Sequence, residues 1–98
     1  MNDRIQCIVS DLDFTLLNSR RELNPADIQE LKRLQAAGVP FTFVTGRHFM
    51  FAKKFVRQTG LSIPFSSSNG ALIYDPKGKR PLRVNTIEPG LCGRIVRY

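Results

Sequence analysis

A short apolar run, Ile5-Gln6-Cys7-Ile8-Val9, ends at Ser10-Asp11, and a second acid, Asp13, follows two positions later. A short run rich in aliphatic and β-branched residues predicts a strand covered on both faces, in which we expect Cys7 to be buried. If strand geometry persists past Ser10, both carboxylates project to the same side. Paired carboxylates are costly unless a cation neutralises them or one keeps a proton, so the pattern indicates metal or proton chemistry at the end of a strand.

Strands and helices are expected to alternate along the rest of the chain. Asn24-Pro25, an apolar residue at every third position and the stop at Gly38 predict one amphipathic helix, and a second is expected from about His48 to Thr59. The expected strands are 41–44, 63–66, 71–74 and 82–84, with a turn at 75–78 and a further helix opening after about Thr86. This order predicts an α/β fold around a parallel sheet with right-handed crossovers.

A second polar motif, Thr45-Gly46-Arg47, follows the second expected strand and opens the helix after it. It offers a hydroxyl, a small residue and a guanidinium where helix N-termini favour anions. Sheets of this class bind ligands beyond the carboxyl ends of their strands, so we expect this motif and Asp11 to share one site. Two plainer readings remain: Asp11 and Asp13 could merely cap a turn, and Thr-Gly-Arg could be an ordinary strand-to-helix turn.

Composition narrows the class of protein. The 98 residues leave room for one small domain with a thin core. The net charge of +7 comes from basic clusters around Lys53–Arg57 and Lys77–Arg83, which we interpret as solvated faces because no nucleic-acid-binding module accompanies them, so nucleic acid is not an expected partner. No run approaches the roughly 20 apolar residues of a membrane span. The start of the chain carries no signal-peptide pattern, so a cytoplasmic location is expected.

Three motifs, taken in order, resemble one known family. The motifs are Asp11-Leu12-Asp13-Phe14-Thr15-Leu16-Leu17, Thr45-Gly46-Arg47 and Ser68-Asn69-Gly70-Ala71. They resemble the haloacid dehalogenase (HAD) superfamily and, within it, the Cof-type sugar-phosphate phosphatases with an inserted α/β cap. The resemblance, which runs from Ile5 to about Val84, implies a Rossmann-like parallel sheet in a three-layer α/β/α arrangement with a β-hairpin. Residues 1–84 would then form the amino-terminal part of the core domain, and residues 85–98 the start of an incomplete cap.

The resemblance also implies a chemistry. It implies a Mg²⁺-dependent phosphoric-monoester hydrolase of small phosphorylated metabolites that works through an aspartyl-phosphate. Asp11 would be the nucleophile and Asp13 the general acid and then base, with Mg²⁺ held by an Asp11 carboxylate oxygen and the Asp13 main-chain carbonyl. Asp13 favours phosphoryl transfer, because displacing a halide from carbon needs no acid there. The other motif residues would bind phosphate or lie near the substrate: Thr45, Gly46, Arg47 and Asn69.

The sequence departs from the family pattern in two ways. Phe14 stands where the family usually has glycine, which predicts a differently shaped turn. Nothing after Tyr74 resembles the family's later lysine or its Gly-Asp metal motif, and Lys77 and Lys79 are poor substitutes. We therefore expect the chain to be truncated and inactive alone. Its first strand, central in the family's sheet, would be an open edge that favours a homodimer or strand exchange.

Other functions stay open at this level. A phosphomutase would share the aspartyl-phosphate step and differ only in where the phosphoryl group goes. A non-catalytic phosphate-binding module could use the same anion site without turnover. A basic nucleic-acid binder is the third alternative, and strongly salt-dependent retention on a DNA or heparin column would reveal it.

Overall fold

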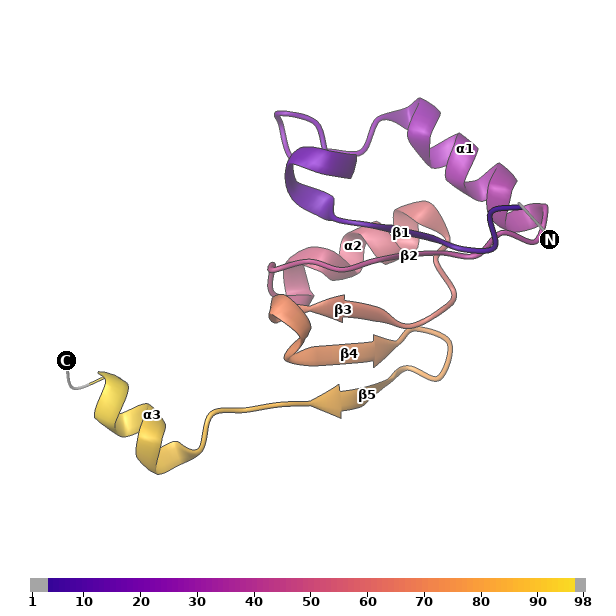
Figure 1. Ribbon diagram of the computed structural model, residues 1–98. Coiled ribbons are helices and arrows are strands. Elements are labelled where there is room, and N and C mark those ends of the chain that lie inside the picture. Colours follow the sequence, from indigo (N-terminus) through magenta and orange to yellow (C-terminus); the bar gives the residue numbers. More distant parts are fainter. Residues whose placement is uncertain (1–3, 97–98) are drawn as a thin grey trace.

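The computed structural model describes residues 4–96 (Figure 1). The strands are β1 (Ile8–Ser10), β2 (Phe41–Phe43), β3 (Phe65–Ser67), β4 (Leu72–Asp75) and β5 (Arg80–Val84). The helices are α1 (Pro25–Ala36), α2 (Phe49–Thr59) and α3 (Pro89–Val96), with an irregular helical turn at Leu12–Leu16 and a short 3₁₀ turn at Ser68–Gly70. The expected α/β alternation and hairpin are confirmed, with bounds that shift by a few residues.

The five strands lie side by side in chain order (Figure 1). β1 and β2 are parallel, with Ile8 opposite Phe41. A single parallel bridge between Val44 and Ser66 links β2 to β3, and β3, β4 and β5 continue as an antiparallel meander. Because β1, β2 and β3 run in the same direction, their carboxyl ends meet at one edge of the layer, and this edge carries the site described below.

The core lies on one face of this layer. The aromatic rings of Phe41, Phe43, Phe55 and Phe65 are buried there, and the centroids of Phe43 and Phe65 are 5.0 Å apart. α1 and α2 pack together beside these rings, and the Gln35 side-chain amide donates to the Thr59 carbonyl at 2.8 Å. Residues 4–96 therefore contain the strands and one of the two helical layers of the expected three-layer arrangement.

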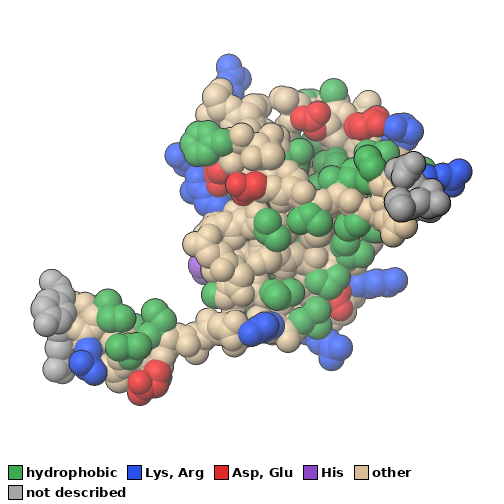
Figure 2. All heavy atoms as spheres, in the orientation of Figure 1, with side chains coloured by type: hydrophobic (Ala, Val, Ile, Leu, Met, Phe, Trp, Pro, Cys, Tyr) green, Lys and Arg blue, Asp and Glu red, His purple; other side chains and the backbone are tan. Residues whose placement is uncertain are grey.

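The opposite face of the layer is open. Val9 and Val44, which point away from the core, are 59% and 47% exposed, and hydrophobic side chains are visible over the strands in Figure 2. The expectation of a first strand covered on both faces is therefore wrong, and so is that of a buried Cys7, which is exposed. The physical reason is that β1 has only β2 beside it within residues 4–96 and helices on only one side. Strand exchange or dimerisation through this edge stays a prediction.

α3 lies apart from the rest of the molecule, at the end of an extended stretch after β5 (Figure 1). All of its described side chains are exposed, apolar ones such as Leu91 and Ile95 included. The division into a core of residues 1–84 and a cap that starts at residue 85 stays a prediction. Within residues 4–96, no helix combines the length and apolarity needed to cross a bilayer.

Candidate active site

Asp11 stands directly after β1, at the lip of the core. Its carboxylate Oδ1 accepts a hydrogen bond from the Leu12 N–H at 2.7 Å and so caps the turn that follows. The plainer reading of Asp11 as a turn cap is thus correct as far as it goes, but the side chain also lines a pocket. The strand ends at Ser10, and in the irregular turn at Leu12–Leu16 Phe14 adopts a left-handed conformation with φ of +62°.

Thr45, Gly46 and Arg47 form the loop between β2 and α2. Thr45 is 4% exposed, and its Oγ1 accepts a hydrogen bond from the Arg47 N–H at 3.0 Å. A Cβ at position 46 would stand 2.8 Å from the Asn69 Oδ1, closer than real Cβ contacts come. The glycine is therefore needed so that the side chain of Asn69 can lie against this loop.

The loop is fastened to the 3₁₀ turn after β3 by main-chain hydrogen bonds. The Ser68 N–H donates to the Arg47 carbonyl at 2.8 Å, and the Asn69 N–H donates to the Thr45 carbonyl at 3.1 Å. A third bond, from the Thr45 N–H to the Ser66 carbonyl at 3.0 Å, continues the pairing back into β3. Asn69 has φ of +55°, a conformation that asparagine tolerates better than most residues. The positions of Thr45 and Asn69 are therefore fixed relative to each other.

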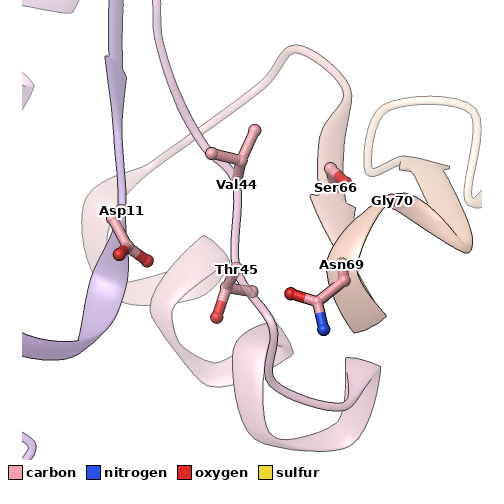
Figure 3. Close-up of a pocket in the computed structure, with 6 residues that line it drawn as sticks. All are labelled: Asp11, Val44, Thr45, Ser66, Asn69 and Gly70. Atoms are coloured by element: carbon pink, nitrogen blue, oxygen red, sulfur yellow. The ribbon is translucent and has the colours of Figure 1, made fainter.

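A pocket of about 350 Å³ opens where these segments meet. Figure 3 shows Thr45 between Asp11 and Asn69, with the Asn69 amide turned towards it. The pocket thus brings together three of the sequence-predicted residues from three separate segments. Its other lining residues, Val44, Ser66 and Gly70, were not predicted as site residues. Ser66 lies near the carboxyl end of β3 and Gly70 belongs to the Ser-Asn-Gly motif that follows this strand, and that position is the signal that could have found them.

Asp13 and Arg47 do not line this pocket and instead pair with each other. The Arg47 Nε and Nη2 donate to the two Asp13 carboxylate oxygens at 2.8 and 3.1 Å. These hydrogen bonds, with the charge of Arg47, hold the pKa of Asp13 below its ordinary value of 3.8 and outweigh partial burial, which acts the other way. The guanidinium also lies 4.6 Å from the ring centre of Phe51. The ion pair therefore favours the ionised form of the Asp13 carboxyl.

The remaining sequence candidates lie elsewhere. Lys79 borders a different pocket, and neither it nor Lys77 lines the one that holds Asp11. Within the described residues, no group of three acidic, histidine or cysteine side chains gathers to form a protein-only metal cage. The donors near Asp11 are hard oxygens, however, and Mg²⁺ is commonly held by one or two carboxylates together with water and substrate phosphate. The donor set at Asp11 fits that mode of binding.

Comparison with known proteins identifies the class. Residues 8–98 match the family described as haloacid dehalogenase-like hydrolase, and the chain belongs to this family. The chain is 36% identical to the Escherichia coli pyridoxal phosphate phosphatase YbhA over 78 residues, covering 80% of this chain and 29% of that protein. It is 32% identical over 91 residues to a glucosyl-3-phosphoglycerate/mannosyl-3-phosphoglycerate phosphatase of Persephonella marina, covering 93% of this chain and 32% of that protein.

The fold matches solved structures of the same family. A haloacid dehalogenase-like hydrolase from Bacteroides thetaiotaomicron superposes with a TM-score of 0.87 at 23% identity, over 96% of this chain and 36% of that one. The chain spans about a third of the length of the curated relatives it matches.

Proposed function

We propose that this chain carries the nucleophile and phosphate-binding part of a Mg²⁺-dependent phosphatase acting on small phosphorylated metabolites of the sugar-phosphate type. The observation that carries the proposal is the single pocket lined by Asp11, Thr45 and Asn69 at the carboxyl ends of β1, β2 and β3. Relatives named as phosphatases of pyridoxal phosphate and of phosphoglycerate glycosides support this substrate class.

The first half of the reaction uses Asp11 as the nucleophile. One carboxylate oxygen is engaged by the Leu12 N–H, which leaves the other to attack phosphorus. As the new O–P bond forms, the ester P–O bond breaks, and the departing alcohol oxygen takes a proton from the Asp13 carboxyl. Thr45 and Asn69 would hold the phosphoryl oxygens, because a hydroxyl and a side-chain amide can each donate a hydrogen bond to an anionic oxygen.

The second half of the reaction returns the chain to its starting state. Water attacks the phosphorus of the aspartyl-phosphate, and the Asp13 carboxylate now takes the proton from that water. The bond between phosphorus and the Asp11 oxygen breaks, which releases inorganic phosphate and restores the free carboxylate. An Asp11 carboxylate oxygen and the Asp13 main-chain carbonyl would hold Mg²⁺, whose positive charge would offset the repulsion between the carboxylate and the phosphate.

The ion pair between Asp13 and Arg47 sets a condition on this mechanism. Arg47 lowers the pKa of Asp13 and so favours its ionised form, whereas the first step requires a protonated carboxyl. The two are reconciled if Arg47 leaves Asp13 when a substrate enters and contacts the substrate's own anionic group instead. Losing the guanidinium raises the pKa of Asp13 towards the range in which it can donate a proton. Arg47 would thus control when Asp13 can be protonated, and it would also contact the substrate.

Phosphate binding, followed residue by residue, tests the proposal. Inorganic phosphate is titrated into the ¹⁵N-labelled 98-residue chain with and without Mg²⁺ while the amide resonances are recorded. We expect saturable shifts at Thr45, Gly46 and Asn69 that strengthen with Mg²⁺, and we expect Asp11→Asn to remove the Mg²⁺ effect. Asp27→Asn on α1 is the matched control and should change nothing. Shifts that avoid the pocket, or that ignore Asp11→Asn, would contradict the proposal.

Turnover separates the phosphatase from a module that only binds phosphate. With Mg²⁺ and a generic phosphate ester we expect negligible hydrolysis by the 98-residue chain, because losing even one preorganised electrostatic contact typically lowers turnover about 10²–10³-fold and the pocket includes no lysine from the described residues. Robust hydrolysis that Asp11→Asn abolishes would overturn the expected inactivity while supporting the chemistry. Phosphate binding with no response to Mg²⁺ would favour the non-catalytic binding module.

A further inference from the structure

A second pocket, of about 370 Å³, lies between α2 and the hairpin of β4 and β5. It is on the opposite side of β3 from the pocket that holds Asp11, because Phe65 lines one and Ser66 lines the other. Adjacent residues of a strand point to opposite faces. A ligand in the second pocket would therefore leave the Asp11 pocket free, so the two are separate sites. The volume falls in the range of about 300–1,000 Å³ typical of small-molecule sites.

Aromatic rings form the floor of the second pocket. The ring centres of Phe49 and Tyr74 are 4.7 Å apart, and Phe65 lies 6.1 Å from Phe49 and 5.9 Å from Tyr74. Phe65 is buried, whereas Phe49 and Tyr74 are half-buried and keep ring surface available. Rings held together in this way offer a rigid apolar surface against which a planar ligand can stack.

Three cations surround this floor. Lys53 and Arg57 stand one helical turn apart on α2, and Lys79 comes from the hairpin turn opposite. The ion pairs within residues 4–96 are Arg33–Glu30 and Arg47–Asp13, so these three cations have no acidic partner among the described residues. Like charges one turn apart on a helix repel each other. The pocket is therefore electrostatically suited to an anion.

Among the residues that the structure describes, no acidic side chain lines the pocket to compete with an anionic ligand for these cations. The neighbouring acid in the sequence, Asp75, turns its carboxylate into the hairpin, where Oδ1 accepts a hydrogen bond from the Lys77 N–H at 3.0 Å. The hairpin turn thus satisfies its own acid and presents Lys79 to the pocket. A single ligand could therefore contact both the cations and the aromatic floor.

We propose that this second pocket binds a small aromatic anion of the nucleoside monophosphate type. The base would stack against Phe49 and Tyr74, and the phosphate would lie among Lys53, Arg57 and Lys79. An anion without a ring would leave the aromatic floor unused, and an uncharged ring would leave three cations unneutralised. The pocket is distinct from the proposed active site, so the ligand would bind without reaching Asp11.

The test titrates the ¹⁵N-labelled 98-residue chain with AMP, and in parallel with adenosine and with ribose 5-phosphate. We expect saturable AMP-induced shifts centred on Tyr74, Lys53 and Arg57, with AMP binding about tenfold more tightly than either half-molecule, because both kinds of contact contribute. Arg57→Gln should weaken AMP binding about tenfold through loss of a charge-assisted contact. Tyr74→Leu should weaken binding of AMP and leave binding of ribose 5-phosphate unchanged.

Lys32→Gln on the outer face of α1 is the matched control, since it removes the same charge away from the pocket. If it weakens AMP binding as much as Arg57→Gln does, the attraction is only that of a basic surface and the proposal fails. Equal affinity for AMP and ribose 5-phosphate would also overturn it. AMP-induced shifts confined to Thr45 and Asn69 would place the ligand in the other pocket and overturn it as well. None of these results bears on whether Asp11 is a nucleophile, so the two proposals fail independently.

Discussion

On one side of the candidate active site, Thr45 and Asn69 lie on loops joined to each other by main-chain hydrogen bonds and continuous with the buried ends of β2 and β3. On the other side, Leu12 is anchored in the core, but the side chains of Asp11 and Phe14 are exposed and that of Asp13 is half-buried. These side chains are held by a capping bond and an ion pair, and Phe14 has a left-handed backbone conformation. The first side takes its shape from the backbone and the core. The second side depends on side chains that a ligand could rearrange.

This difference assigns separate tasks to the two sides. Binding a phosphate demands donors that stand in place before the ligand arrives, since reorganisation would cost affinity. Moving a proton demands a carboxyl whose pKa can change during the reaction, and the pairing of Asp13 with Arg47 allows that change. The rigid part of the molecule therefore carries the proposed anion site, and the adjustable part carries the proposed acid.

The largest loss of stability should come from a substitution in the core beneath the rigid side. Phe43 is fully buried between the strands and α2. Phe43→Ala should cost about 3–5 kcal/mol, a large part of the roughly 5–15 kcal/mol that stabilises a typical domain. Chemical denaturation followed by circular dichroism measures the loss. Phe14→Ala removes the same ring from a fully exposed position and should change the free energy of unfolding far less. An equal loss of stability in the two variants would break the comparison between the two sides.

A smaller change in stability should reveal whether the buried polar groups of the rigid side all have hydrogen-bond partners. The Ser67 hydroxyl on β3 is fully buried and has no hydrogen-bond partner among residues 4–96. Burying an unpaired hydroxyl costs about 1–3 kcal/mol, so Ser67→Ala should raise the free energy of unfolding by about 1 kcal/mol. Ser66→Ala, next to it on the pocket face, should leave stability nearly unchanged. A clear loss of stability in Ser67→Ala would mean that this hydroxyl is already satisfied.

Strain on the adjustable side should be measurable at Phe14. A non-glycine residue in the left-handed region costs about 1–2 kcal/mol, whereas glycine costs about 0.5–1 kcal/mol in lost chain freedom. Phe14→Gly should therefore stabilise the fold by about 0.5–1 kcal/mol. Phe14→Ala keeps the Cβ and most of the strain, so it should gain less than Phe14→Gly. Equal gains in the two variants would show that the turn is not strained.

The smallest effect concerns pH. Because Arg47 lowers the pKa of Asp13 in the folded state, the ion pair stabilises the fold above the ordinary carboxyl pKa of 3.8. That contribution should disappear as the pH falls below 3.8 and through the lowered value. The difference in melting temperature between wild type and Asp13→Asn should thus shrink in acid. Arg47→Gln should have the same profile as Asp13→Asn, and a difference that persists at low pH would exclude the ion pair as its source.

Most of the architecture followed from local chemistry. Asn24-Pro25 and Gly38 bracket α1, and His48 caps α2 through its Nδ1, which accepts a hydrogen bond from the Met50 N–H at 3.1 Å. The Asp-x-Asp and Thr-Gly-Arg motifs each fall at a strand end, so Asp11 and Thr45 could be expected to share a pocket from the order of elements, whereas Asn69 was expected there only from the resemblance to the HAD superfamily.

Other features depended on partners that a linear pattern does not specify. Cys7 and Val9 look like core residues, but their burial depends on whether something covers the outer face of β1. Asp13 and Arg47 are 34 positions apart, and their pairing requires a turn whose shape is set by the conformation of Phe14. Gly46 was expected near the substrate, and the structure adds that its missing side chain makes room for Asn69. In each case a neighbour distant in the sequence decides the outcome.

The hydrogen bonds that fasten the Thr45–Arg47 loop to the Ser68–Gly70 turn join amide and carbonyl groups that every residue except proline possesses. The side chains at positions 47 and 68 could therefore change during evolution without loss of the main-chain hydrogen bonds that join this loop to this turn. Gly46 is the exception, because any side chain there would displace Asn69. Single substitutions around the pocket could therefore change which substrate binds, while the main-chain hydrogen bonds that position the anion site stay the same.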